Sequence, residues 1–146
     1  SLAESLPGDV SPLKVSKVSA SSVSDEKNKP ENTIDGDLSA GSRWSSNGIR
    51  QWIQYDLESE KSIEYISLAF YAGDQRKARF IVLTSKDGQN WTDVCKDVSS
   101  GNTLEMENYK LNPSSGRYVR ILCFGVDFGT GMSAANSIME VKIFGR

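Results

Sequence analysis

Residues 79–96 read RFIVLTSKDGQNWTDVCK and contain the pattern that decides the fold. Residues 79–85 are rich in β-branched and aromatic side chains, and a second apolar segment occupies residues 91–96. Between them lies the run Lys86-Asp87-Gly88-Gln89-Asn90, whose residue types favour tight turns. Short apolar runs bounded by such turns are typical of β-strands. We therefore predict two strands joined by a short turn.

The same alternation of apolar segments and turns extends in both directions along the chain. Further strands are predicted at residues 15–20, 51–57, 62–71, 103–110, 117–124 and 137–144, with turns at 58–60, 99–102 and 112–116. No long segment shows the 3.6-residue periodicity of an amphipathic helix. The fold class is therefore predicted to be all-β, an antiparallel sandwich or barrel. The residues expected inside it are Trp44, Trp52, Ile53, Tyr55, Ile66, Leu68, Phe80, Val82, Trp91, Val119, Ile121 and Ile143.

The length of 146 residues fits a single domain. Residues 1–13 mix Ser, Pro, Gly and acidic side chains without periodicity, so we expect a linker or terminal segment there and the folded unit at residues 14–146. The longest apolar run, residues 63–71, is interrupted by Glu64 and Ser67 and is far shorter than the roughly 20 residues of a membrane helix.

Charge and composition exclude several classes of function. The formal net charge is −2, so we expect neither nucleic-acid binding nor adhesion to an anionic membrane. The chain has no histidine, which removes Ser-His-Asp and Cys-His catalysis and the usual zinc sites. A glycosidase with two carboxylates remains an alternative, but we expect no catalytic residues. Cys95 and Cys123 lie in apolar segments and are expected to be buried thiols, with a disulfide as the alternative.

The loop at residues 32–44 places Asp35 and Asp37 on either side of Gly36. Calcium prefers carboxylate, carbonyl and hydroxyl oxygens, and a glycine allows the backbone to turn its carbonyls inward. An ordinary turn in which the Asp side chains bond to nearby backbone has the same composition. Spacing alone favours that ordinary turn over a calcium site.

Several segments together resemble discoidin domains, the coagulation-factor C type, and particularly family 32 carbohydrate-binding modules. They are residues 31–37 (ENTIDGD), 42–46 (SRWSS), 51–57 (QWIQYDL), 85–91 (SKDGQNW), 116–121 (GRYVRI) and 138–143 (IMEVKI). The resemblance implies a galactose-binding-like jelly-roll β-sandwich of about eight antiparallel strands, with ligand loops at one end. It covers roughly residues 14–146.

The resemblance also implies a structural calcium ion. Asp35 matches a side-chain ligand, and Glu140 matches a late acidic ligand. Thr33 and Asp37 match positions that offer backbone or side-chain oxygens, and Ser42 stands where a hydroxyl residue is common. Such an ion would tie the first loop to the last strand. In this family, Trp44 and Trp52 would serve packing, and we expect Arg43 and Arg120 to pair with surface carboxylates.

Ligand contact is predicted in the loops between strands. Residues 71–77 combine an aromatic ring, a carboxylate, an amide and two cations, which are groups that bind sugars. The candidate ligand residues are Tyr71, Asp74, Gln75, Arg76 and Lys77, followed by Asn47, Arg50, Phe128, Met132 and Asn136. A solvated charged turn is the alternative for each. Residues 73–77 are similar to modules attached to alginate lyases, whereas the lack of histidine departs from many galactose-binding members.

We therefore predict a non-catalytic module that targets an attached glycoside hydrolase or polysaccharide lyase, linked upstream, to its glycan. Arg76 and Lys77 favour an acidic glycan such as alginate. The location implied is secreted, periplasmic or cell-surface. Two alternatives are a module for neutral galactose or N-acetylhexosamine and a discoidin-type adhesion or lipid-binding domain. The second of these would expose apolar loop tips such as Phe128 and Met132.

Overall fold

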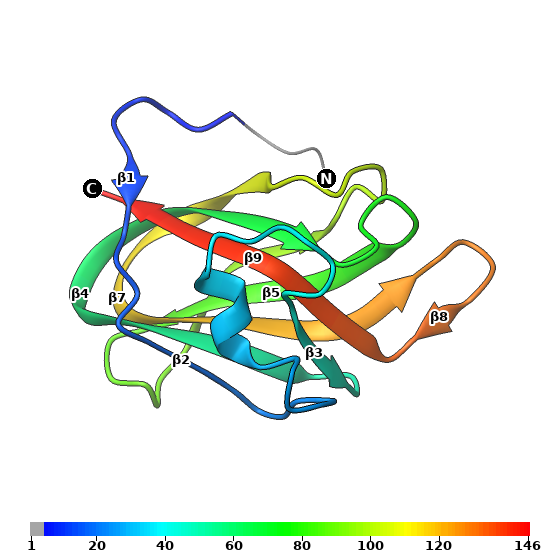
Figure 1. Cartoon of the computed structure of the whole chain (residues 1–146). Coiled ribbons are helices and arrows are strands. Elements are labelled where there is room, and N and C mark those ends of the chain that lie inside the picture. Colours follow the sequence, from blue (N-terminus) through cyan, green and yellow to red (C-terminus); the bar gives the residue numbers. More distant parts are fainter. Residues whose placement is uncertain (1–4) are drawn as a thin grey trace.

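The computed structural model describes residues 5–146, which form an all-β domain (Figure 1). The strands are β1 (Ser11–Pro12), β2 (Lys17–Ala20), β3 (Trp44–Asn47), β4 (Gln51–Phe70), β5 (Lys77–Ser85), β6 (Thr92–Val98), β7 (Glu107–Asp127), β8 (Met132–Ser133) and β9 (Ala135–Gly145). A short 3-10 helix, η1 (Pro30–Ile34), precedes β3. All strand pairs in this part of the chain are antiparallel.

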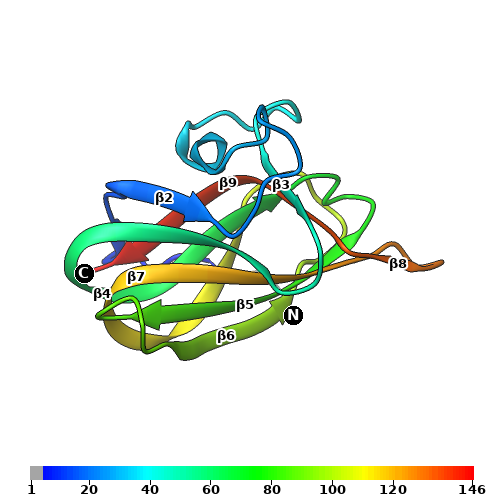
Figure 2. The same cartoon turned by 90° about the horizontal axis from the view of Figure 1, so that it is seen from below.

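Strands β4 and β7 are long and bend, so each contributes to two layers (Figure 2). The first half of β4 pairs with the second half of β7, from Gln51 opposite Cys123 onward. After a register shift, the second half of β4 pairs with the first half of β7, ending with Leu68 opposite Glu107. β2, β5 and β6 extend the first layer, and β9 with β1 and β3 extends the second. The predicted jelly-roll β-sandwich is confirmed.

The two bends explain why eight predicted strands do not map one to one onto the observed ones. Residues 58–60 and 112–116, predicted as turns, lie inside β4 and β7. Glu58 has a φ of 75°, and its amide donates to the Asp56 carboxylate at 2.7 Å, so the strand bends without ending. The prediction missed β1, β3, β8 and η1. The first of these places residues 11–13 in the fold, since the Leu13 amide donates to the Ile143 carbonyl at 2.7 Å.

The core lies between the layers and contains ten of the twelve residues expected there; the exceptions are Trp52 and Trp91. Both rings are half-buried on the outer face of the first layer, where the Arg120 guanidinium lies 4.0 Å from one ring centroid and 4.2 Å from the other. Arg120 also donates twice to the Gln54 side-chain oxygen. The expected pairing of Arg120 with a carboxylate was therefore wrong, because two aromatic faces and an amide occupy its guanidinium.

Strand β5 lies between the strands that carry the two cysteines. Cys95 on β6 is opposite Val82, and Cys123 on β7 is opposite Phe80. The two cysteines do not form a disulfide, as expected, but only Cys123 is fully buried, whereas Cys95 is partly exposed. Burial raises the pKa of the Cys123 thiol to about 12, so it stays protonated at neutral pH. In the described chain, no helix is long and apolar enough to span a bilayer.

Tyr55 connects the core to the segment that precedes the candidate site. Its ring is fully buried, and its hydroxyl lies 2.8 Å from the Thr33 hydroxyl. Thr33 donates to the Pro30 carbonyl at 2.8 Å, so Tyr55 acts as donor to Thr33. Burial raises the pKa of Tyr55 far above its ordinary value, which keeps this donor protonated. Helix η1 is thereby fixed on the sandwich.

We predict that Tyr55→Phe lowers the free energy of unfolding by about 1–2 kcal/mol, because a buried hydrogen bond is lost. Urea denaturation measures the change. Tyr118→Phe is the matched control: that ring is half-buried and carries no hydroxyl hydrogen bond to any described residue, so a change within about 0.5 kcal/mol is expected. Equal effects of the two substitutions would contradict the anchoring role of Tyr55.

Candidate functional site

The candidate site is formed by loops at the end of the sandwich opposite the bends of β4 and β7 (Figures 1 and 2). Backbone hydrogen bonds hold these loops together. The Tyr71 amide, just after β4, donates to the Ser137 carbonyl at 3.1 Å, and the Gly48 amide donates to the Ala134 carbonyl at 2.8 Å. The loop between β3 and β4, the turn after β4 and the segment from β7 to β9 therefore meet at one end.

Two arginines from separate loops converge on Tyr71. The Arg43 guanidinium lies 4.2 Å from the Tyr71 ring centroid, and the Arg76 guanidinium lies 5.3 Å from it. Arg43 is positioned by donation to the Ala40 carbonyl and to the Ser45 hydroxyl, and Arg76 donates to the Tyr71 carbonyl at 3.3 Å. Arg43 was expected to pair with a carboxylate, which is wrong: it stacks on an aromatic ring instead.

The electrostatics of this cluster favour an anion. Neither Arg43 nor Arg76 forms an ion pair within the described residues. Burial lowers the pKa of Arg76, the nearby Tyr71 opposes this shift, and the like charge of Arg43 adds to it. Two partly desolvated guanidinium groups side by side repel each other. A carboxylate bound between them would relieve that repulsion and accept charge-assisted hydrogen bonds.

Next to this cluster lies a cavity of about 270 Å³. It brings together four of the predicted ligand residues, Gln75, Arg76, Lys77 and Phe128, and its other lining residues are Gly101, Asp127 and Gly129. Phe128 is 46% exposed, so its ring is available to a ligand. Asp74 is exposed in the same turn but does not line the cavity. Cations, an amide and an aromatic ring thus share one opening.

The remaining candidates lie apart from this cavity. Asn47 is exposed at the end of β3, and Met132 is 57% exposed in β8. The Arg50 guanidinium lies 5.9 Å from the centroid of the Phe124 ring, on the outer face of the first layer. Asn136 is buried: its amide oxygen accepts from the Gly125 amide at 2.8 Å and its nitrogen donates to the Gly48 carbonyl at 2.7 Å. Asn136 was predicted to contact ligand; in the structure its side chain instead holds the backbone at Gly48 and Gly125 together.

We predict that Asn136→Ala lowers the free energy of unfolding by about 2–3 kcal/mol, because the buried Gly125 amide and the partly buried Gly48 carbonyl lose their partner. Thermal or urea denaturation measures this loss. Asn47→Ala, at an exposed amide, should change stability by less than about 0.5 kcal/mol. An Asn136→Ala variant with unchanged stability would contradict this structural role and favour the predicted contact with ligand.

The loop at residues 35–42 and strand β9 gather the oxygen atoms expected for a cation. Ser42 donates a short hydrogen bond to the Asp35 carboxylate, and the Gly36 amide donates to Glu140 Oε2 at 3.0 Å. Glu140 Oε1 is buried and has no hydrogen-bond partner. Burial raises the pKa of Glu140 to about 7, and the neighbouring Asp35 adds to the shift. An unsatisfied carboxylate oxygen beside a second carboxylate fits a hard cation.

Two of the predicted ligands contribute differently from the expectation. The Asp37 carboxylate accepts from the Ser39 amide at 2.8 Å, which lowers its pKa, and it is exposed. The Thr33 hydroxyl is occupied by Pro30 and Tyr55, which leaves only its carbonyl. The described residues contain no cluster of three or more His, Cys, Asp or Glu side chains suited to a metal. The structure therefore gathers Asp35, Ser42 and Glu140, and not the full predicted set.

Comparison with known proteins assigns the chain to a domain family. Residues 17–141 match the family model of the F5/8 type C domain. The chain belongs to the F5/8 type C, or discoidin, domain family, and among its members it is similar to family 32 carbohydrate-binding modules. Among curated protein sequences, none matches this chain significantly.

Solved structures show the same relationship. The CBM32 of AlyQ, in complex with 4,5-unsaturated mannuronic acid, is 39% identical, with a TM-score of 0.84 over 92% of this chain and 98% of that one. A truncated AlyQ with CBM32 and alginate lyase domains is 38% identical, and this chain spans only 33% of it. A pectin-binding carbohydrate-binding module is 29% identical, with a TM-score of 0.80 over 90% of this chain and 91% of that one. A Clostridium perfringens module at 16% identity shares the fold.

Proposed function

We propose that this module binds an acidic glycan that carries uronate groups and thereby holds an attached carbohydrate-active enzyme on its substrate. The observation that carries the proposal is the convergence of Arg43 and Arg76 on Tyr71 without a carboxylate partner among the described residues. Two guanidinium groups provide planar donors that match a carboxylate, and the adjacent Phe128 offers an apolar surface to a sugar ring.

The relatives support this proposal. One of them is bound to an acidic monosaccharide, and the same module occurs on a chain with an alginate lyase domain. For the present chain, we infer an enzyme partner of the glycoside hydrolase or polysaccharide lyase class, joined in the same polypeptide and acting outside the cytoplasm. Tethering a binding module to an enzyme raises the local concentration of that enzyme on a polymer.

We predict that Arg76→Ala weakens binding of a mannuronate disaccharide by about tenfold or more, because a charge-assisted hydrogen bond contributes about 1.5–3 kcal/mol. Isothermal titration calorimetry measures the affinity. Binding should also weaken as salt rises. Lys110→Ala removes an exposed cation from the half of β7 that belongs to the other layer and should leave affinity unchanged. Equal or tighter binding of a neutral N-acetylhexosamine disaccharide, unaffected by Arg76→Ala, would reject the acidic-glycan proposal.

We further propose that Asp35, Ser42 and Glu140 hold a calcium ion together with backbone carbonyls of the loop that contains Asp35. The free oxygen of Glu140 supports this assignment. Calcium would supply charge compensation for the two carboxylates and order the loop that ends at Arg43. The ion would therefore act on the glycan site indirectly, through the position of the Arg43 guanidinium.

Chelation is predicted to lower the melting temperature of the module, and readdition of calcium should restore it, because an ion that binds only the folded state stabilises that state. Differential scanning calorimetry provides the measurement. Asp35→Asn should melt near the temperature of the chelated wild type and respond little to chelator. The control Asp74→Asn, in the exposed turn after β4, should keep the full response. A melting temperature that ignores chelator would reject the calcium site.

A second candidate function is attachment to lipid, as in a discoidin adhesion domain. The observation that favours it is the exposure of Phe128 and Met132, at 46% and 57%, at the tip between β7 and β9. Phe128 shares the loop cavity with Arg76 and Lys77, so this tip offers a small apolar surface with flanking cations. Sedimentation with phosphatidylserine vesicles tests this candidate, and loss of sedimentation in Phe128→Ser would support it.

A further inference from the structure

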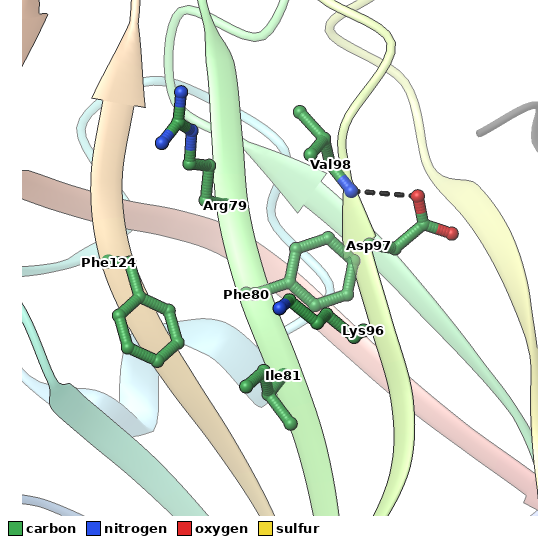
Figure 3. Close-up of a pocket in the computed structure, with 7 residues that line it drawn as sticks. All are labelled: Arg79, Phe80, Ile81, Lys96, Asp97, Val98 and Phe124. Carbon is green, nitrogen blue, oxygen red and sulfur yellow. Dashed lines mark hydrogen bonds between the residues drawn. The ribbon is translucent and has the colours of Figure 1, made fainter.

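A second cavity lies outside the loop site, on the outer face of the first layer. It measures about 530 Å³, and Arg79, Phe80, Ile81, Lys96, Asp97, Val98 and Phe124 line it. Figure 3 shows the cavity across three neighbouring strands, with Phe124 on β7, Arg79 and Ile81 on β5, and Lys96 on β6. Its volume lies within the range of pockets that hold small ligands, about 300–1,000 Å³.

Strand pairing explains why Arg79, Ile81, Lys96 and Val98 share one face. Ile81 lies opposite Lys96, and Arg79 lies opposite Val98, so β5 and β6 present them on the same side of the sheet. Side chains alternate between the faces of a strand, and the neighbours Phe80 and Val82 are buried in the core. Phe124 alternates in the same way between two residues that do not face solvent. The cavity therefore opens outward, with half-buried apolar residues as its floor.

This groove is continuous with the loop site. Arg79 lines the groove and Asp127 lines the loop cavity, and their side chains lie 3.9 Å apart. Lys77, which lines the loop cavity, precedes Arg79 and Ile81 on the same face of β5, since Ala78 and Phe80 between them are buried. At about 3.3 Å per residue, the distance from Lys77 to Ile81 is roughly 13 Å, which exceeds the size of one sugar ring.

The charges along this path favour an anionic chain. The cations are Arg50, Lys77, Arg79 and Lys96, and the acidic residues are Asp97 and Asp127. Asp127 offsets the charge of Arg79, which lies 3.9 Å away, and the Asp97 carboxylate accepts from the Val98 amide at 2.7 Å, so the four cations exceed the two acidic residues. The path is therefore locally positive on a chain whose net charge is −2. Phe124, with Arg50 at 5.9 Å from its ring centroid, provides an aromatic surface beside these cations.

We propose that the outer face of β5, β6 and β7 is a second binding region, which takes the continuation of a uronate polymer whose one end occupies the loop site. The inference rests on the proposed function and deepens it: the module grips a stretch of several sugar units. Phe124 and Ile81 contact the apolar face of a sugar ring, and Lys96 and Arg79 meet carboxylates of successive units. Affinity therefore rises with the length of the glycan.

The test compares a mannuronate disaccharide with a hexasaccharide by calorimetry. For the wild type, we expect the hexasaccharide to bind about tenfold or more tightly, since one added charge-assisted contact is enough for that factor. Lys96→Glu should remove most of this gain while the disaccharide affinity changes by less than about twofold. Phe124→Ala should act in the same direction, with its melting temperature recorded because that ring is half-buried. Lys110→Glu, with the same charge change in the other layer, should keep the gain.

Several outcomes would overturn the proposal. If the disaccharide binds through Arg76 but length adds nothing, the second region is absent and the proposed function stands. If neither sugar binds, both fail. If Lys96→Glu weakens the disaccharide and the hexasaccharide equally, the groove is not a separate region. If Lys96→Glu instead abolishes self-association in analytical ultracentrifugation and leaves the length dependence intact, the face binds a second copy of the chain.

Discussion

Strands β4 and β7 remain hydrogen-bonded to each other while both cross from one layer of the sandwich to the other. Because each strand bends back at the same end, all four of their termini lie at the opposite end of the molecule (Figure 2). Tyr71 directly follows the end of β4, and Phe128 directly follows the end of β7. One pairing thus determines where the site loops begin. A slip by one residue would reverse every side chain between core and solvent, so the register is strongly fixed.

The arginines named here have different partners at the two ends of the sandwich. At the end with the bends, Arg117 forms a 2.9 Å ion pair with Asp56, and Arg146 forms one of 2.6 Å with Glu64. At the loop end, Arg43 and Arg76 stack on Tyr71 instead and have no acidic partner among the described residues. Stacking on an aromatic ring offsets part of the free energy that is lost when a guanidinium group is desolvated. It leaves the N–H donors in the guanidinium plane available to a ligand. That arrangement is suited to a carboxylate ligand.

The sequence was sufficient for the fold because strand length, turn residues and apolar content agree locally with the tertiary structure. It was less successful where a strand continues through polar residues. Glu58 and the run at 112–116 have turn chemistry, yet they fall at register shifts inside β4 and β7, and pairing continues beyond them, with Lys61 opposite Gly116. The sequence predicted only part of the candidate site. Gln75, Arg76, Lys77 and Phe128 share a cavity as the loop composition suggested, whereas Arg43 had no signal, since only the fold brings it to Tyr71. Asn136 was misread because a polar residue next to a loop looks the same whether it binds ligand or backbone.

A net charge of −2 disfavours an acidic ligand at long range. The attraction between a bound carboxylate and the protein is dominated by groups within about one Debye length, roughly 8 Å at physiological salt. Carboxylates such as Asp56 and Glu64, at the far end and already paired, contribute little at that range. The ligand charge that the site favours therefore depends on where the unpaired cations lie and not on the net charge of the chain. The net charge supplies no long-range steering of an acidic glycan, so the selectivity that we propose would rest on contacts made after encounter.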